Sequence, residues 1–205
     1  MTTLISRNIV KKHLLKEIQS GNLQIGNTIN LAAFSRKLNV SVTPIREALA
    51  QLEESKIVKA VPKRGFIINT LSIKEATDLY NTVAELEAVA LDTAIFTTAM
   101  KVELKETLVK LQQSHTAKRK LRLRMHFHEI IVAACDNNIL KTILEKLKAR
   151  IFFYEQLYFD NPEFYETIDN QNEGILRAIE EDNLPTAALI LKMNWMTVLD
   201  YLKSN

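Results

Sequence analysis

VSVTPIREAL, residues 40–49, is the stretch that decides the fold of this chain. Ser41 or Thr43 can cap a helix here, and Pro44 suits the first turn, where its missing N–H is not needed. Leu49 then falls on the inward side of the same helix. The stretch therefore predicts a helix with a polar beginning.

A second helix precedes this one, and a tight turn joins the two. Apolar residues recur at helical spacing over roughly 30–38. Asn39 supplies the turn, because asparagine tolerates left-handed backbone geometry. Two short helices so closely joined predict a helix-turn-helix. An earlier helix, ended by Gly21, is predicted from apolar residues at helical spacing, namely Ile5, Ile9, Leu14 and Ile18.

A β-hairpin is predicted after the helix-turn-helix. Residues 57–61 and 66–69 are β-prone, and the turn PKRG at 62–65 separates them. Lys63 and Arg64 stand at the tip, where a cation can reach the DNA backbone or the minor groove. The hairpin therefore predicts the wing of a winged helix. An ordinary solvated turn, in which lysine and arginine are also common, is the alternative.

The charge of the chain is unevenly distributed. Residues 1–69 contain eleven Lys and Arg against four Asp and Glu, a net charge of +7. Residues 70–205 contain sixteen against twenty, a net charge of −4. A basic module joined to an acidic one indicates a nucleic-acid partner for the first module. A few extra charges on a small domain are the alternative.

Composition excludes several classes of protein. The single cysteine, Cys135, excludes an internal disulfide framework and a cysteine-based zinc finger. The sequence has no run of about 18 apolar residues that would predict a transmembrane helix, and its N-terminus lacks the features of a signal peptide. We therefore expect a cytoplasmic protein with no membrane partner.

Residues 21–65 resemble the DNA-binding domain of the GntR family of bacterial transcription regulators. The core string of that family, Val-Ser-Arg-Thr-Pro-Val-Arg-Glu-Ala-Leu, stands here as VSVTPIREAL. The spacing of Gly21 and Gly26 and the glycine of the wing tip, Gly65, match as well. Val42 departs from the pattern, since the family usually has an operator-reading arginine at this position.

The resemblance and the helix geometry together predict the DNA contacts. The hydroxyls of Ser41 and Thr43, at a helix N-terminus, suit phosphate binding. Arg46 suits bidentate contact with guanine, with a salt bridge inside the domain as the alternative. Either Arg46 carries more of the base readout than usual, or Val42 makes an apolar contact, such as with a thymine methyl group. The predicted DNA-binding residues are Ser41, Val42, Thr43, Arg46, Lys63, Arg64 and Gly65.

The fold class is predicted to be mainly α. A winged helix-turn-helix domain over residues 1–70, with a small hairpin wing, precedes an all-α helical bundle over residues 71–205. Apolar residues recur at helical spacing through most of the second domain, and Pro162 and Pro185 each mark the first turn of a helix.

Polar side chains interrupt the apolar stripes of three of these helices. His128, Asn172 and Asn194 each fall on such a stripe, and Arg124 borders the stripe of His128. Burying such groups without partners costs on the order of 1–3 kcal/mol each. They therefore bond one another as ordinary core residues, or they line a polar cavity that takes a ligand.

Residues 72–203 are similar to the FCD domain, the helical effector domain of the FadR-type branch of the GntR family, notably over 127–129, 137–140 and 174–179. In that domain an aspartate and three histidines often bind a metal beside a carboxylate ligand. The matching positions here are Arg124, His128, Asn172 and Asn194. Only the histidine is a good ligand for a zinc-like metal. The resemblance therefore implies an effector site without metal or other cofactor, in which Arg124 holds a small carboxylate.

Together these features predict a ligand-responsive transcription regulator. A homodimer formed through the helical domain would place two winged helices on a two-fold-related double-stranded operator, and the effector would bias their spacing. An architectural DNA-binding protein without an effector is the alternative. We do not expect an enzyme using His128 and Arg124, because no nucleophile–base pair, phosphate-binding glycine loop or paired carboxylates accompany them.

Overall fold

The computed structural model describes residues 9, 10, 12–14, 16, 17, 22, 23, 26–158 and 162–204. The chain divides into two compact units, Met1–Leu71 and Ser72–Asn205, one residue beyond the boundary expected from the sequence. Among the helices within the described ranges, none combines the length and the apolar character that crossing a membrane requires.

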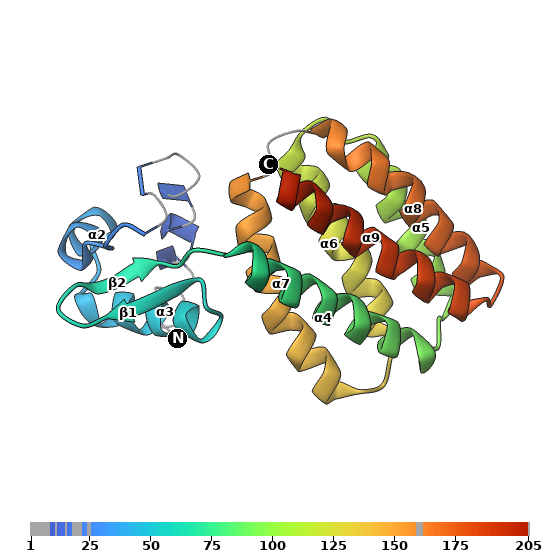
Figure 1. The fold of residues 1–205 in the computed structure, drawn as a ribbon, viewed down its shortest axis with the longest axis horizontal. Helices are drawn as coiled ribbons and strands as arrows, with labels where there is room; N and C mark the ends of the chain where they lie inside the picture. The colour runs from blue at the N-terminus through green and yellow to red at the C-terminus, as the bar shows by residue number, and fades with distance from the viewer. Residues whose placement is uncertain are drawn as a thin grey trace. The chain divides into compact units, whose positions relative to one another are not determined.

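The N-terminal unit contains the predicted helix-turn-helix (Figure 1). Helix α2 spans Leu31–Leu38 and helix α3 spans Val42–Glu54. Asn39 joins them in the left-handed conformation, with a φ of 51°. The side chain of Asn30 caps α2 by accepting a hydrogen bond from the N–H of Ala33 at 3.0 Å. The prediction from the local pattern of residues is thus confirmed.

The core of this unit forms from the inward faces of its helices. Ile45 and Leu49 of α3 are fully buried, and Phe34 of α2 is buried as well. Of the predicted first helix, the residues that the structure describes between positions 9 and 17 are helical. The predicted helix end at Gly21 lies outside the described residues, as do Ile5 and Ile18 of the same stripe.

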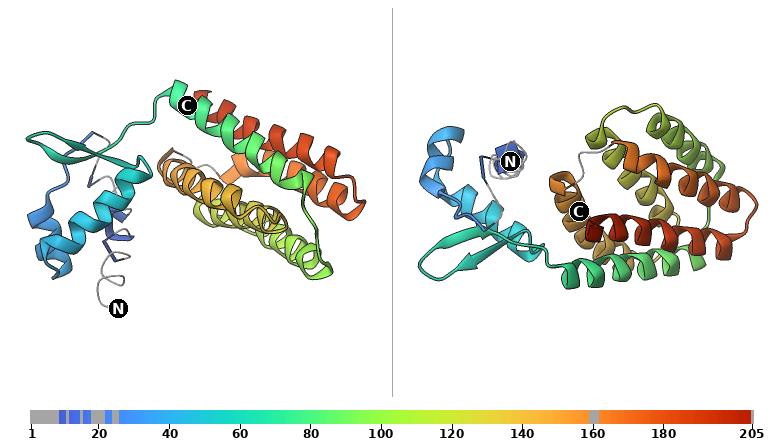
Figure 2. Two further views of the ribbon diagram at one scale, coloured as in Figure 1. Left: turned by 90° about the horizontal axis from the view of Figure 1, so that it is seen from below. Right: turned by 45° about the horizontal axis from the view of Figure 1, so that its top comes forward.

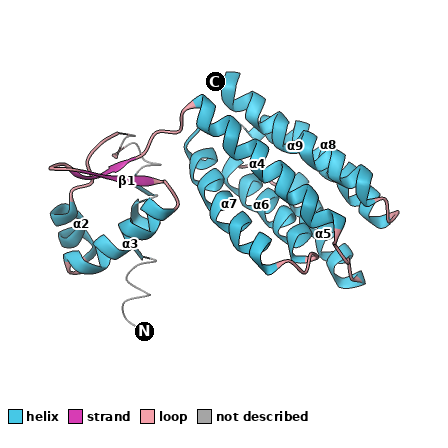
Figure 3. Cartoon of the chain, turned by 60° about the horizontal axis from the view of Figure 1, so that its bottom comes forward, coloured by secondary structure: helices cyan, strands magenta, loops and turns pink. Residues whose placement is uncertain are grey.

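The predicted hairpin follows α3 (Figure 3). Strands β1 (Val58–Val61) and β2 (Gly65–Ile68) pair antiparallel. Lys63 and Gly65 turn the chain with left-handed φ values of 63° and 79°, and Gly65 adopts its value without steric cost. The segment 26–29 also bonds to β2 through its backbone, so the hairpin is held to the rest of the unit.

The C-terminal unit is an all-α bundle, as predicted. Its described helices are α4 (Ile73–Asp92), α5 (Thr98–Gln112), α6 (Ala117–Ala133), α7 (Asn138–Tyr158), α8 (Pro162–Glu180) and α9 (Leu184–Ser204). Helix α9 packs between α4 and α8, α5 packs against α6 and α8, and α7 packs against α4 and α6 (Figures 1 and 2). Pro162 begins α8, and Pro185 lies in the first turn of α9, as the sequence predicts.

The apolar stripes of these helices meet in one core. Among the largest fully buried side chains are Trp195 of α9, Tyr80 of α4 and Phe127 of α6. Charged residues are buried beside them, including Arg124 and Glu155, whose side chains have no solvent exposure. The core of this unit is therefore partly polar, and that part forms the second candidate site.

Candidate DNA-binding surface and effector site

The first turns of α3 present polar side chains to solvent. Ser41, Thr43 and Arg46 are exposed, Val42 is half-buried, and Ile45 beneath them is buried. Ser41 occupies the N-cap position, but its hydroxyl makes no capping hydrogen bond and stays available to another acceptor or donor. The geometry thus points the expected DNA-contacting side chains outward, as a recognition helix requires.

The wing presents two further cations. Lys63, Arg64 and Gly65 are all exposed at the hairpin tip. Across the ranges that the structure describes, no ion pair joins Lys63, Arg64 or Arg46 to a carboxylate. The salt bridge that was the alternative for Arg46 is therefore absent there, and the three cations are free to meet phosphate or base edges.

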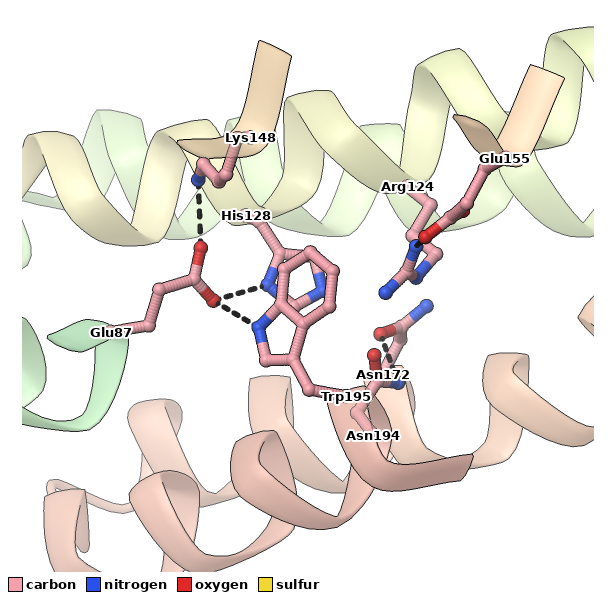
Figure 4. Close-up of polar contacts among 8 residues, drawn as sticks. All are labelled: Glu87, Arg124, His128, Lys148, Glu155, Asn172, Asn194 and Trp195. Carbon is pink, nitrogen blue, oxygen red and sulfur yellow. Dashed lines mark hydrogen bonds and ion pairs between the residues drawn. The ribbon is translucent and has the colours of Figure 1, made fainter. Parts of the chain in front are cut away.

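The four predicted effector residues lie close together in the bundle interior. Arg124, His128, Asn172 and Asn194 are each fully buried. The amide of Asn194 donates from Nδ2 to Oδ1 of Asn172 at 3.1 Å (Figure 4). The guanidinium of Arg124 lies 4.4 Å from the ring centroid of Trp195, and the His128 ring lies 4.6 Å from it. Three helices, α6, α8 and α9, thus supply one cluster.

Two buried carboxylates, neither of them predicted from the sequence, complete this cluster. Nη1 of Arg124 donates to the two oxygens of Glu155 at 3.1 and 3.0 Å. Glu87 accepts from Nδ1 of His128 at 2.6 Å, from Nε1 of Trp195 at 2.7 Å and from Nζ of Lys148 at 2.7 Å (Figure 4). The site expected from the sequence has one arginine, one histidine and two amides, and the structure adds these two carboxylates.

The basic run that begins α6 is only partly solvated. Lys118, Arg119 and Arg122 are exposed, whereas Lys120 and Arg124 are buried. Lys120 pairs with Asp169 of α8 at 3.1 Å, and Arg124 pairs with Glu155 of α7. Acidic residues far away in the sequence bring these two cations into the core.

The protonation of the cluster follows from burial and charge. Burial alone raises the pKa of Glu87, but His128 and Lys148 outweigh it and lower that pKa to about 2. Burial lowers the pKa of His128, against the attraction of Glu87. Burial raises the pKa of Glu155, against the effect of Arg124. When His128 is neutral, Glu87 is paired with Lys148 and Glu155 is paired with Arg124. The formal charges of the cluster therefore balance.

Several polar atoms of the cluster have no partner among the residues that the structure describes. They are Nε and Nη2 of Arg124, Nε2 of His128, Nδ2 of Asn172 and Oδ1 of Asn194. Leaving a buried polar atom unpaired costs about 1–3 kcal/mol. The Nε–Nη2 edge of a guanidinium is a fork that matches a carboxylate. These atoms are what a ligand in the interior could bind.

The cluster does not fit the metal that FCD domains often hold. Within the described parts of the chain, no three His, Cys, Asp or Glu residues are placed to hold a metal ion. The two amides of Asn172 and Asn194 are poor ligands, and Arg124 repels a cation. Glu87 and Glu155 already bond to cationic side chains.

Comparison with known families follows the same division of the chain. The family model described as "Bacterial regulatory proteins, gntR family" matches residues 7–68, and the model described as "FCD domain" matches residues 78–194. The chain belongs to the GntR family. Its helical bundle is an FCD domain, so this GntR-family chain is a transcriptional regulator with a helix-turn-helix domain and an effector-binding domain.

Several bacterial transcription regulators are similar in sequence to this GntR-family chain. It is 29% identical over 180 residues to the Bacillus subtilis uncharacterized HTH-type transcriptional regulator YdhC, covering 85% of this chain and 80% of that protein. It is 28% identical over 143 residues to the Escherichia coli HTH-type transcriptional repressor GlaR, covering 65% of each chain. Both relatives bear the names of transcription regulators.

Solved structures share the fold at lower identity. Escherichia coli McbR/YncC superposes with a TM-score of 0.75 at 21% identity and covers 100% of this chain and 99% of its own. A GntR regulator from Rhodococcus sp. RHA1 superposes with a TM-score of 0.77 at 17% identity, covering 97% of each chain.

Proposed function

We propose that this chain is a ligand-responsive regulator that binds, as a homodimer, an operator made of two-fold-related half-sites. One observation carries the proposal: among the described residues, the cations of the recognition helix and wing have no ion-pair partner, and polar atoms buried in the helical domain have no hydrogen-bond partner. The first set suits DNA, and the second suits a small ligand.

On the DNA side, the two elements have different roles. Arg46 reads a base edge, because it is exposed early in the recognition helix and has no carboxylate partner among the described residues. Ser41 and Thr43 contact phosphate at the helix N-terminus. Lys63 and Arg64 contact the backbone or the minor groove, and Gly65 shapes their turn. Val42 supplies an apolar contact beside them.

On the effector side, a small carboxylate binds the free Nε–Nη2 edge of Arg124. Nδ2 of Asn172 is a second unpaired donor in the same cluster. Since Glu155 already balances the charge of Arg124, a bound carboxylate adds negative charge to the interior. Protonation of Glu155 or of His128 offsets that charge. Binding is therefore expected to be tighter at lower pH.

The homodimer follows from the geometry of DNA. One chain carries one recognition helix, and a two-fold-related pair of half-sites needs two. A closed dimer with two-fold symmetry is the common solution. Effector binding in each helical domain then changes DNA affinity by favouring one spacing of the two readers.

The test uses a variant that spares both buried ion pairs. Asn172→Leu with Asn194→Leu replaces both partners of one hydrogen bond by residues of similar size, which is often nearly neutral for stability. Acetate, propionate, succinate and benzoate are titrated while Trp195 fluorescence and operator affinity are followed. The parent should respond to one of them and the double variant should not. A parent that responds to none, with operator binding intact, would favour an architectural DNA-binding protein without an effector.

A further inference from the structure

A groove lies between α6 and α7, apart from the interior cluster. Its volume is about 600 Å³, and all the residues that line it come from these two helices. That volume lies within the range of about 300–1,000 Å³ that small-molecule sites typically have. None of Arg124, His128, Asn172 and Asn194 lines it. The groove is therefore a place distinct from the proposed effector site.

The floor of the groove is apolar. Met125 and Val132 of α6 and Leu144 of α7 line it and are themselves buried, and Phe152 closes it as a half-buried ring. Apolar side chains gathered in a hollow favour an apolar ligand group, because its burial removes surface from water.

The charged residues of the groove favour an anion. Arg122, Lys141 and Lys148 line it, against Glu129 and Glu145. Arg122 and Lys141 form no ion pair with any residue in the described ranges. Glu129 lies 3.5 Å from Nδ1 of His126, which offsets its charge when that histidine is protonated. Lys148, the third cation, already pairs with Glu87, so the preference for an anion rests on Arg122 and Lys141.

Lys148 gives the groove a buried cation. Its side chain is only 9% exposed, and Nζ donates to Oε1 of Glu87 at 2.7 Å. An ammonium has three N–H donors, so this bond leaves capacity for a second acceptor. Glu87 also bonds to His128 and Trp195, so Lys148 joins the groove to the interior cluster (Figure 4).

We propose that the groove between α6 and α7 is a second ligand site that takes a small amphipathic carboxylate. The apolar part of the ligand lies on Met125, Leu144 and Phe152, and its carboxylate accepts a hydrogen bond from Lys148. A ligand here shares the ammonium of Lys148 with Glu87 and so changes the surroundings of Trp195 and His128. Ligand binding in this groove is separate from the proposed function, because it does not require a ligand in the interior cluster.

Octanoate is the probe for the test, and octan-1-ol is the matched probe without a charge. The full chain carries methionines with ¹³C-labelled methyl groups and a ¹⁵N-labelled indole on Trp195, its single tryptophan. Octanoate should shift the Met125 methyl resonance saturably, and leave Met100 and Met193 outside the groove unchanged. Octan-1-ol should bind at least about tenfold more weakly, because it cannot form the charged hydrogen bond. The Trp195 indole resonance should move together with that of Met125.

Two variants separate the groove from the rest of the protein. Ala149 is exposed and lines the groove, so Ala149→Trp fills it without entering the core. Ala99 is exposed on α5 and does not line the groove, so Ala99→Trp is the matched control. Octanoate affinity should fall at least about tenfold in the first variant and stay unchanged in the second.

Four results would overturn the proposal. The first is the absence of a saturable shift of Met125, and the second is equal affinity for octanoate and octan-1-ol. The third is a Met125 resonance that moves with protein concentration alone, which would show that a second copy of the chain covers the groove. Octanoate binding that survives Ala149→Trp but is lost in the Asn172→Leu, Asn194→Leu variant would place octanoate in the interior. That result would support the proposed effector site and overturn this one.

Discussion

Glu155 accepts two hydrogen bonds from a single nitrogen, Nη1 of Arg124, in the interior of the helical domain. Both side chains are fully buried, and the hydroxyl of Tyr80 donates to the same carboxylate at 3.0 Å. One edge of the guanidinium is thus occupied while its Nε–Nη2 edge has no partner among the described residues. Arg124 is at once a structural ion-pair partner and a candidate ligand-binding group.

The first prediction concerns this ion pair. Arg124→Ala leaves the Glu155 carboxylate buried without its cation, and removing one partner of a buried pair typically costs about 3–5 kcal/mol. The free energy of unfolding, measured by urea denaturation, should fall by that amount. Arg124→Met combined with Glu155→Met removes both charges and should recover most of the loss. Equal stability of Arg124→Ala and the parent would contradict the buried pair.

The second prediction concerns the recognition helix. Arg46→Ala should weaken operator binding by roughly 1–3 kcal/mol, because a bidentate contact to guanine is lost. Binding to random duplex at the same salt should change much less. Titration with both DNAs measures the difference, and Arg177→Ala, an exposed arginine on α8, is the control. The assignment fails if the ratio of the two affinities is the same in Arg46→Ala and in the parent.

The third prediction concerns the wing. Arg64→Ala should weaken binding to operator and to random duplex by similar factors, because a backbone contact carries no sequence information. The slope of log affinity against log salt should become shallower by about 0.9 for one lost phosphate contact. Lys105→Ala on α5 is the control and should leave the slope unchanged. An unaltered slope together with unaltered affinity would mean that the wing does not touch DNA.

The DNA-binding elements could be predicted from the sequence because their signals are local. The motif at 40–49, the turn at Asn39 and the turn at 62–65 each set the backbone within a few residues. Amphipathic periodicity likewise predicts the helices of the second domain, and it places His128 on the inner side of α6 with Arg124 at the border of that side. Both kinds of inference depend only on neighbours within one element.

The buried carboxylates could not be predicted in the same way. Glu87 lies seven residues after Tyr80 and four after Val83, so the stripe of α4 carried a signal that it faces inward. Its partners, however, come from α6, α7 and α9, and only the packing of four helices brings them together. Glu155 meets Arg124 for the same reason. A sequence shows that a position faces the core, whereas the partner that satisfies it is a property of the tertiary structure.

The fourth prediction concerns metal content. The cluster offers one good transition-metal ligand, Nε2 of His128, where such metals need three or four. The purified protein should therefore contain no stoichiometric zinc, nickel or manganese by elemental analysis. Prolonged treatment with a chelator should leave the melting temperature unchanged. Close to one metal per chain, or a fall in melting temperature after chelation, would contradict this prediction.

The last prediction concerns pH. Burial lowers the pKa of His128 in the folded chain, against the attraction of Glu87 and together with the charges of Arg124 and Lys148. As the pH falls below about 6.5, the unfolded chain therefore takes up this proton before the folded chain does, and the folded state loses stability. The free energy of unfolding should decrease steadily from about pH 7 to pH 5, the range in which an ordinary histidine titrates. The carboxyl of Glu87 adds a loss at lower pH, because its folded pKa of about 2 lies below the unfolded value. Glu155 acts in the opposite direction, since its raised pKa favours the folded state as it protonates.

Urea denaturation at each pH measures the sum of these three contributions, and His128→Gln should flatten the curve of unfolding free energy between pH 7 and 5. His126→Gln, which replaces an exposed histidine on the same helix by the same residue, is the matched control. A curve that stays equally steep in His128→Gln would assign the pH dependence to groups other than His128.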